Sequence, residues 1–304
     1  MTRVWLPDSP EAFGGLPAGI EADVWKGDDE LPPTADDVEF VVLPPGVKPA
    51  EALRKIGTLP RLRTVQTLNA GVDHILPFLP PNVTLCNARG AHTPATAEWT
   101  AGVIIASLRD FPRFTAAQLA GHWDWAETDS VMGKRVLIVG YGSIGEAVER
   151  RLAGWEVTID RVARHARDGV HAMGELPSLL PNADVVVILV PVTEETKQLV
   201  NAEFLKTMKD GALLVNAARG VIVDTGALLA ELTSGRLRAA LDVTDPEPLP
   251  DGHPLWSAPG LLLTPHVGGA IHGARDRAYR VVAAQLVRLG AGEPLLNIIS
   301  ADGY

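Results

Sequence analysis

The sequence predicts an α/β fold, and three observations carry that prediction. Short apolar runs rich in β-branched residues recur along the chain, as is typical of strands buried on both faces of a parallel sheet. Stretches with helical spacing of apolar residues alternate with these runs. The 29 glycines and 24 prolines supply turns for many short elements. A length of 304 residues is enough for about two domains of ~150 residues each.

The apolar runs give the predicted strands in order along the chain: Val38–Leu43, Thr64–Leu68, Val83–Cys86, Arg135–Val139, Val185–Val190, Ala212–Val215, Ala239–Val243 and Leu261–Leu263. Two helices stand out: Thr96–Leu108, with apolar residues three and four apart, and a long one over about 270–289. The strands before Thr96 are shorter and more polar than those after it. We therefore place a boundary near Ala95–Ala97 and expect one domain from residues 1–96 plus 269–304, and another from 97–268.

Composition excludes several classes of protein. The net charge of −10 argues against a general nucleic-acid binder, which usually carries a basic patch. The single cysteine, Cys86, rules out an internal disulfide and a zinc cluster. The first residues lack a signal-peptide pattern, and the longest apolar run, Val185–Val190, is far below the ~18 residues of a membrane span. We expect a cytoplasmic protein with no metal, no nucleic-acid partner and no membrane partner.

A glycine-rich loop is the strongest local signal. The predicted strand Arg135–Val139 runs directly into G-x-G-x-x-G, and a helical pattern follows. Gly140 would permit the tight turn, Gly142 the close approach of a pyrophosphate, and Gly145 close packing of helix on strand. Backbone N–H groups at Ser143 and Ile144, where the helix starts, would face the phosphates. This arrangement predicts dinucleotide binding.

The residues from Asp160 onward, around the end of the strand expected after this helical pattern, decide which dinucleotide binds. Asp160 lies 20 residues beyond Gly140, the usual place of a ribose-binding acid. Arg161, Arg164 and Arg167 follow it and suit a 2′-phosphate instead, unless they form a solvated basic turn. If the strand continues through Ala163, Asp160 lies inside it. We expect NAD(P)(H), with NADP(H) favoured over NAD(H).

Polar residues follow three later strands, at Arg219, at Asp242 to Glu247, and at His266. In an open α/β sheet, ligands bind outside the carboxyl ends of the strands. Each residue alone has an ordinary explanation: an ion-paired arginine, a strand-end cap, a solvated glutamate or a packed histidine. Together they suggest a catalytic site.

In this order, the motifs resemble those of the D-isomer-specific 2-hydroxyacid dehydrogenase family. The matching segments are NAGVDH (69–74), ATAEWT, GYGSIG, PVTEET (191–196), NAARG, DVTDPEP, and HPLW followed by TPHVGG. The resemblance implies two Rossmann-like, doubly wound domains with the active site in the cleft between them. By this resemblance, residues 97–268 bind the dinucleotide, and 1–96 with 269–304 form the substrate-binding domain.

The resemblance also implies roles for single residues. Arg219 would bind the substrate carboxylate, His266 would act as acid and base, and Glu247 would orient His266. Substrate contacts are further expected at Asn69, Ala70 and Gly71. Besides the glycine loop, Asp160, Arg161 and Arg164, the expected cofactor contacts are Val190, Pro191, Thr196, Ala217, Ala218, Asp242, His266 and Gly268. A guanidinium binds a carboxylate at two points, and a positioned imidazole can supply the proton that accompanies hydride transfer.

The expected function is reduction of a small 2-oxoacid, such as glyoxylate, hydroxypyruvate or pyruvate, to the D-hydroxyacid. Two alternatives stay open: a phosphite-type dehydrogenase, and a non-catalytic, dinucleotide-sensing binding protein of the same fold. A formate-oxidising relative is disfavoured, since that branch carries Gln at the position of Glu247. Members of the family commonly dimerise, and we expect a homodimer through Thr96–Trp125, with Trp123 and Trp125 near the interface. The alternative is that these tryptophans pack on the protein's own helices.

Overall fold

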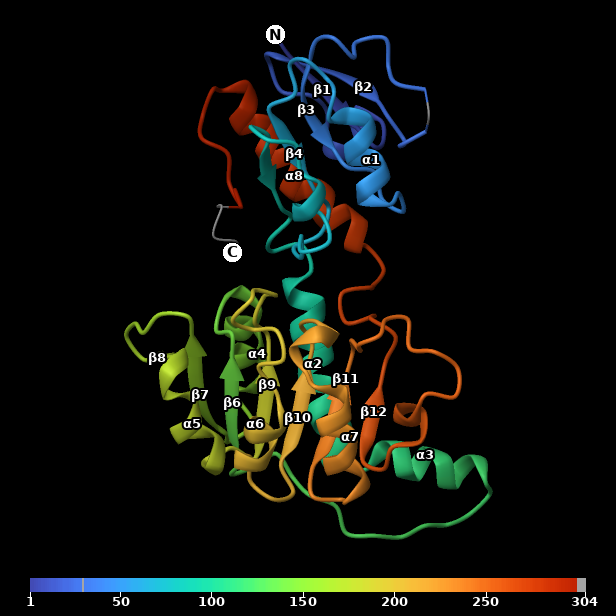
Figure 1. Ribbon diagram of the computed structural model, residues 1–304, viewed down its shortest axis with the longest axis vertical. Helices are drawn as coiled ribbons and strands as arrows, with labels where there is room; N and C mark the ends of the chain where they lie inside the picture. Colours follow the sequence, from blue (N-terminus) through green and yellow to red (C-terminus); the bar gives the residue numbers. More distant parts are fainter. Residues whose placement is uncertain (29, 300–304) are drawn as a thin grey trace. The chain divides into compact units, whose positions relative to one another are not determined.

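The computed structural model describes residues 1–28 and 30–299, and the chain divides into two compact units (Figure 1). Unit 1 comprises residues 1–92 and 272–304, and unit 2 comprises residues 93–271. Each unit contains its own parallel sheet with helices packed on it. The predicted α/β class is therefore confirmed.

Unit 1 has a five-stranded sheet in the order β2-β1-β3-β4-β5, with every neighbouring pair parallel. This is one of the two common orders of doubly wound sheets. The strands are β1 (Thr2–Leu6), β2 (Ile20–Val24), β3 (Val38–Val42), β4 (Thr64–Gln66) and β5 (Thr84–Cys86). Strands β1 and β2 were not predicted from the sequence, although β1 is an interior strand whose last three residues are fully buried.

Helices cover both faces of the unit 1 sheet. Helix α1 (Pro49–Ile56) buries Leu53 and Ile56 against one face. Helix α8 (Ala274–Gly290) buries Val282 and Leu286 against the other. The short helices η1 (Pro10–Phe13) and η2 (Leu76–Phe78) lie in the connections. The C-terminal tail returns to the sheet, where Ile298 pairs antiparallel with Cys86.

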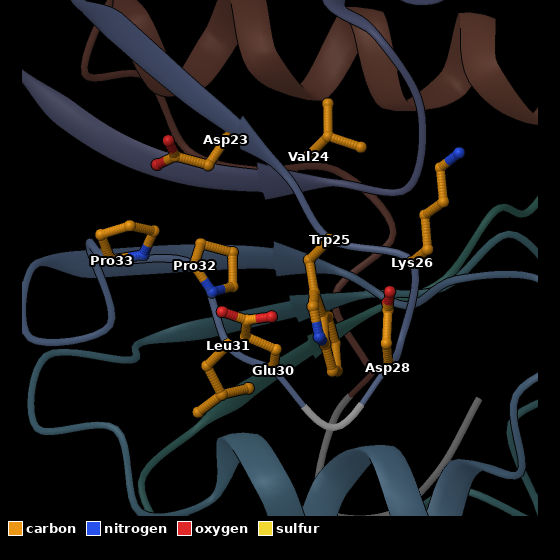
Figure 2. Close-up of a pocket in the computed structure, with 9 residues that line it drawn as sticks. All are labelled: Asp23, Val24, Trp25, Lys26, Asp28, Glu30, Leu31, Pro32 and Pro33. Atoms are coloured by element: carbon orange, nitrogen blue, oxygen red, sulfur yellow. The ribbon is translucent and has the colours of Figure 1, made fainter.

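A surface hollow of about 360 Å³ opens beyond the end of β2 (Figure 2). Three of its lining residues are acidic, Asp23, Asp28 and Glu30, against one lysine, Lys26. This charge disfavours an anionic substrate, and the hollow contains none of the predicted site residues. Most of the predicted site residues lie instead at the glycine loop and the strand ends of unit 2.

Unit 2 has a seven-stranded parallel sheet in the order β12-β11-β10-β9-β6-β7-β8. The strands are β6 (Arg135–Val139), β7 (Thr158–Ala163), β8 (His171–Ala172), β9 (Val185–Ile188), β10 (Leu213–Asn216), β11 (Arg238–Leu241) and β12 (Leu261–Leu263). The chain starts at β6 in the interior, builds outwards to β8, and then crosses to β9 on the other side. The order therefore reverses between β6 and β9, and in such sheets ligands bind at this switch point.

Two layers of helices enclose the unit 2 sheet. On one face lie α2 (Thr93–Leu108) and α4 (Ser143–Leu152). On the other lie α5 (Leu176–Leu179), α6 (Ala202–Thr207) and α7 (Thr225–Thr233). Helix α3 (Phe111–Leu119) has no buried residue. The remaining short helices are η3 (Met173–Glu175), η4 (Leu180–Asn182), η5 (Gly220–Ile222) and η6 (Pro254–Ser257). No helix in the described ranges is both long and apolar enough to span a bilayer.

Candidate active site

The glycine loop joins β6 to α4 at the switch point. Gly140 has φ +104°, and a Cβ there would lie 2.5 Å from the carbonyl carbon of Leu189, which follows β9. The backbone N–H groups of Gly140 and Tyr141 both donate to the Val162 carbonyl of β7, at 2.9 and 2.8 Å. Only glycine fits at Gly140, both for its φ and for its contacts.

The other two glycines meet different demands. A Cβ on Gly145 would lie 3.1 Å from the Ile138 side chain. Helix α4 therefore packs closely on β6 at this point, as the motif requires. A Cβ on Gly142 would meet nothing within 4 Å. Space is therefore open over Gly142, beside the first-turn N–H groups of Ser143, Ile144 and Gly145, which have no partner inside a helix. These residues fit a dinucleotide pyrophosphate.

Asp160 lies inside β7, where it pairs with Leu137 of β6. Its carboxylate accepts two hydrogen bonds from the Arg135 guanidinium, at 2.9 and 3.1 Å. The strand continues through Ala163, so Asp160 is three residues from the end at which a ribose would bind. Its position and its ion pair both disfavour the predicted ribose contact.

Arg161 also has a partner within unit 2. Its Nε donates to Glu149 of α4 at 2.7 Å, and its Nη2 forms a second, shorter contact with the same carboxylate. The hydrogen bonds from Arg161 lower the pKa of Glu149, and Glu149 in turn raises the pKa of Arg161. Tyr141 Oη donates to Glu149 at 2.5 Å. Burial, and then Glu149, raise the pKa of Tyr141. Arg161 therefore links β7 to α4 instead of extending towards a phosphate.

Arg164 and Arg167 follow the end of β7 and are exposed. Arg164 is the first residue after the strand. The Arg167 guanidinium lies 5.6 Å from the centre of the Tyr141 ring, and its Nη2 donates to the Tyr141 carbonyl at 2.6 Å. The tyrosine inside G-x-G thus ties the arginine turn to the glycine loop. This role of Tyr141 was not predicted from the sequence, in which only its place between Gly140 and Gly142 pointed to it.

The loop after β9 contains three predicted cofactor contacts, Val190, Pro191 and Thr196. Val190 is buried, and the Thr196 hydroxyl donates to the Pro191 carbonyl at 2.6 Å. The same hydroxyl accepts from the Thr193 N–H at 2.8 Å. Thr196 therefore fixes this loop from within, beside the glycine loop.

Arg219 follows β10 through a turn that Asn216 organises. The buried Asn216 side chain accepts from the Ala218 N–H at 3.0 Å and donates to the Arg219 carbonyl at 2.9 Å. Ala217 extends the strand pairing with β9, through a hydrogen bond of 3.3 Å to the Ile188 carbonyl. Arg219 Nη1 donates to the Ala218 carbonyl at 2.8 Å.

Gly220, the residue after Arg219, lies where the loops that follow β10 and β11 contact each other. A Cβ on Gly220 would lie 1.9 Å from the Thr244 carbonyl oxygen, so no other residue fits without backbone movement. Glu247 lies three residues beyond Thr244, in the same connection between β11 and β12. Arg219 and Glu247 are therefore carried by adjacent loops.

His266 and Glu247 form a hydrogen-bonded pair. His266 Nδ1 lies 2.6 Å from Glu247 Oε1, and both side chains are exposed. In the part of the chain that the structure describes, His266 Nε2 has no hydrogen-bond partner. A carboxylate on Nδ1 favours the tautomer with its proton there and leaves Nε2 to face a substrate.

The Asp242 carboxylate builds the turn that presents His266. One oxygen accepts from the Thr264 hydroxyl at 2.6 Å and the Val267 N–H at 2.8 Å, and the other accepts from the Gly268 N–H at 2.7 Å. The His266 N–H donates to the Asp242 carbonyl at 2.7 Å, and His266 itself has φ +54°. Asp242 is buried, so in this structure it holds the turn.

Asn69, Ala70 and Gly71 belong to unit 1, in the loop between β4 and η2. The carbonyls of Asn69 and Ala70 both accept hydrogen bonds from the residues that follow β5. Among the described residues, no group of three or more His, Cys, Asp or Glu is placed to hold a metal ion.

Comparisons with known proteins agree with this geometry. Residues 101–268 match the family described as D-isomer specific 2-hydroxyacid dehydrogenase, NAD binding domain. The chain is 35% identical to a glyoxylate reductase of Thermofilum pendens over 249 residues, which is 77% of this chain and 74% of that protein. A glyoxylate reductase of Thermococcus kodakarensis is 34% identical over 80% of this chain and 78% of its own length.

Solved structures show the same relationship. An NADPH-dependent glyoxylate/hydroxypyruvate reductase from Sinorhizobium meliloti, in complex with NADP and sulfate, is 26% identical with a TM-score of 0.84 over 100% of both chains. A D-isomer specific 2-hydroxyacid dehydrogenase from Xanthobacter autotrophicus, in complex with NADPH and MES, is 28% identical with a TM-score of 0.81 over 98% of both chains.

The family match covers the glycine loop, Arg219, Glu247 and His266. The sheet of unit 2 therefore has a dinucleotide-type switch point between β6 and β9. At the ends of its neighbouring strands it also holds the His266–Glu247 pair and Arg219. Enzymes of the matched family transfer a hydride between a nicotinamide dinucleotide and a small 2-oxoacid or 2-hydroxyacid. The chain belongs to the D-isomer specific 2-hydroxyacid dehydrogenase family.

Proposed function

We propose that this enzyme reduces a small 2-oxoacid of the glyoxylate or hydroxypyruvate type to the D-2-hydroxyacid with NADPH. The observation that carries the proposal is the 2.6 Å contact between His266 Nδ1 and Glu247 Oε1 at the end of β12. This pair supplies a proton donor where the parallel sheet places its ligands. The similarity to glyoxylate reductases supports the substrate class.

Arg219 would bind the substrate carboxylate, because a guanidinium fork makes two parallel hydrogen bonds to it. The consecutive N–H groups of Ala70 and Gly71, in the loop after β4, are the other proposed substrate contacts. Val190, Pro191, Thr196, Ala217, Ala218 and Gly268 would contact the dinucleotide. The Asp242 backbone and side chain would keep His266 in place beside it.

When bound, the dihydronicotinamide supplies the hydride that the carbonyl carbon accepts. As negative charge develops on the carbonyl oxygen, protonated His266 would donate its Nε2 proton to it, which yields the alcohol. Glu247 balances the positive charge of the ring before that transfer. In the reverse direction, neutral His266 would accept the alcohol proton.

A steady-state assay tests the proposed function. Purified protein is mixed with NADPH or NADH and with glyoxylate, hydroxypyruvate, pyruvate or no acid, and cofactor oxidation is followed at 340 nm. We expect turnover with at least one of the first two acids. Cofactor binding without turnover would support the dinucleotide-sensing alternative, and turnover of phosphite with NADP⁺ or NAD⁺ would support the phosphite-type alternative.

Arg164 gives a test of the cofactor preference. We expect Arg164→Ala to raise the KM for NADPH about tenfold and to leave the KM for NADH within about twofold, because only NADPH carries the 2′-phosphate that a guanidinium binds. Arg150→Ala is the control, since it removes an equally exposed arginine from α4. Equal changes for both cofactors would contradict the NADP(H) assignment.

We infer a homodimer from the surface around α3. Trp123 and Trp125 are 90% and 75% exposed, and Leu119 is 85% exposed. Both tryptophans line a hollow of about 390 Å³ with Phe114. Arg113 of α3 forms a two-point ion pair with Asp124, at 2.6 and 2.8 Å, which holds the tryptophan segment against the helix. Large apolar side chains that are exposed next to one another mark interaction surfaces.

Light scattering tests this inference. At micromolar concentration we expect a mass twice the 32.4 kDa of the chain. The double variant Trp123→Ser/Trp125→Ser should shift the mass towards the monomer, because it removes the two largest apolar groups of the surface. Trp256→Ser, at an exposed tryptophan outside this surface, should stay dimeric. A monomeric wild-type protein would overturn the inference.

A further inference from the structure

Two consecutive carbonyls of the loop after β4 accept hydrogen bonds from fixed donors. The Asn69 carbonyl accepts from the Ala88 N–H at 2.9 Å and from the Thr67 hydroxyl at 2.7 Å. The Ala70 carbonyl accepts from Asn87 Nδ2 at 2.7 Å. Both peptide groups are therefore held through their oxygen atoms.

This arrangement fixes the direction of the N–H groups as well. A trans peptide is planar, and its N–H points opposite to its C=O. The only cis bonds found in the described residues lie at Asp245–Pro246 and Glu247–Pro248. The Gly71 N–H therefore points away from Asn87. In the part of the chain that the structure describes, this N–H has no hydrogen-bond partner.

Asn87 is itself held in one orientation. It is 2% exposed, its Oδ1 accepts from the Arg89 N–H at 3.0 Å, and its own N–H donates to the Asn297 carbonyl at 3.1 Å. Because Oδ1 faces a backbone donor, the other side-chain atom must be the nitrogen, which is a donor to Ala70. The amide cannot turn without losing both bonds.

The C-terminal tail, which accepts the Asn87 N–H at the Asn297 carbonyl, is itself held by hydrogen bonds. Buried Gln285 of α8 donates to the Leu296 carbonyl at 2.7 Å and accepts from the Leu296 N–H at 2.8 Å. The Ile299 N–H donates to the Leu85 carbonyl at 2.9 Å. The tail is thus tied to α8 at Leu296 and to β5 at Ile299, on either side of Asn297, whose carbonyl accepts from the Asn87 N–H.

We propose that Asn87 is a positioning residue for the 2-oxoacid, which orients the Ala70–Gly71 peptide so that the Gly71 N–H meets the substrate carboxylate. This inference rests on the proposed function, because that function assigns the loop to carboxylate binding. Asn87 acts through the peptide and does not itself contact the substrate. Its effect is confined to the substrate, since every one of its described partners lies in unit 1.

Kinetics of Asn87 variants provide the first test. In Asn87→Asp, one oxygen still accepts from Arg89, but the other faces the Ala70 carbonyl, so two acceptors repel and the peptide must turn. Asn87→Ala only removes the donor. We expect both variants to raise the KM for the 2-oxoacid at least tenfold, the scale of a lost hydrogen bond to a charged group. The dissociation constant for NADPH should stay within about twofold of the wild-type value.

Thr34→Ala is the control for a loss of stability. The Thr34 hydroxyl, in the connection before β3, donates to Asp23 at 2.5 Å and accepts from Trp5 Nε1 at 3.1 Å, so its removal weakens unit 1 without touching the loop. We expect a lower Tm with an unchanged KM. A wild-type KM in folded Asn87→Ala would overturn the inference while the proposed function stands.

A measurement that does not depend on activity distinguishes failure of this inference from failure of the proposed function. In protein labelled with ¹⁵N-glycine and loaded with NADPH, oxamate, an unreactive 2-oxoacid analogue, should shift the Gly71 amide resonance, which Gly71→Ala identifies. Asn87→Asp and Asn87→Ala should lose this shift. A Gly71 resonance that does not respond in the wild type would overturn the inference even if turnover is normal. Lack of turnover with every 2-oxoacid would instead overturn the proposed function.

Discussion

His266→Ala should lower kcat for 2-oxoacid reduction by about 100-fold or more, the usual scale for the loss of a positioned acid. The variant keeps every group proposed to bind the dinucleotide except the ring itself. Its substrate KM should change far less, because Arg219, the proposed ligand of the carboxylate, is unchanged. Steady-state rates at saturating NADPH measure the effect.

A purely structural histidine would give the opposite pattern, with loss of stability and retention of chemistry. The His266 ring is exposed, and its hydrogen bond to Glu247 is the one described for it. The backbone turn is held by Asp242, not by the ring. His266 has φ +54°, which asparagine tolerates better than alanine. His266→Asn is therefore the second variant, checked by circular dichroism and cofactor titration. A folded, cofactor-binding variant with normal turnover would refute the mechanism.

Arg219→Lys should lower kcat/KM by roughly 100-fold, the scale on which a small misplacement of a substrate costs rate. Lysine keeps the positive charge but lacks the planar fork, so it attracts the carboxylate without fixing its direction. We expect both a higher KM for the 2-oxoacid and a lower kcat, because the carbonyl carbon is no longer aligned. Kinetics over a series of 2-oxoacid concentrations separate the two effects.

Arg236→Lys is the matched control for Arg219→Lys. The Arg236 guanidinium likewise donates to backbone carbonyls, at Leu205 and Met208, and it also pairs with Glu231. Its replacement should lower the Tm and leave kcat/KM near the wild-type value. If Arg219→Lys behaves like Arg236→Lys, the carboxylate is bound elsewhere.

The sequence was most informative where one residue type is required by local geometry. The apolar runs of unit 2 became β6, β9, β10 and β11 because strands buried on both faces are largely apolar, and the run Leu261–Leu263 became the half-buried edge strand β12. The glycine positions matched the loop because Gly140 and Gly145 each sit where a side chain would collide with the backbone or a neighbouring residue. The same requirement holds at Gly220, which the sequence analysis left without a role.

The sequence was less informative where partners come from distant segments. Strand β2 escaped detection because an edge strand with two acidic residues, Glu21 and Asp23, has no apolar run. Asp160 matched the expected spacing, yet Arg135, 25 residues earlier, occupies its carboxylate. The bond from Asn87 to Ala70 spans 17 residues, and no motif spacing indicates it. Such pairings depend on register and topology, which a single sequence does not state.

The kcat of Glu247→Gln tests the central claim most directly, namely that the Glu247–His266 pair supplies the proton. Glutamine can still accept the Nδ1 hydrogen bond, so the ring stays in place, but the carboxylate that offsets the positive charge of the proton-donating ring is gone. Loss of a positioned acid costs about 100-fold or more in rate, and loss of its partner should cost part of this. We therefore expect kcat for reduction to fall roughly tenfold at saturating NADPH, with NADPH affinity unchanged. A folded Glu247→Gln with the wild-type kcat would contradict the claim.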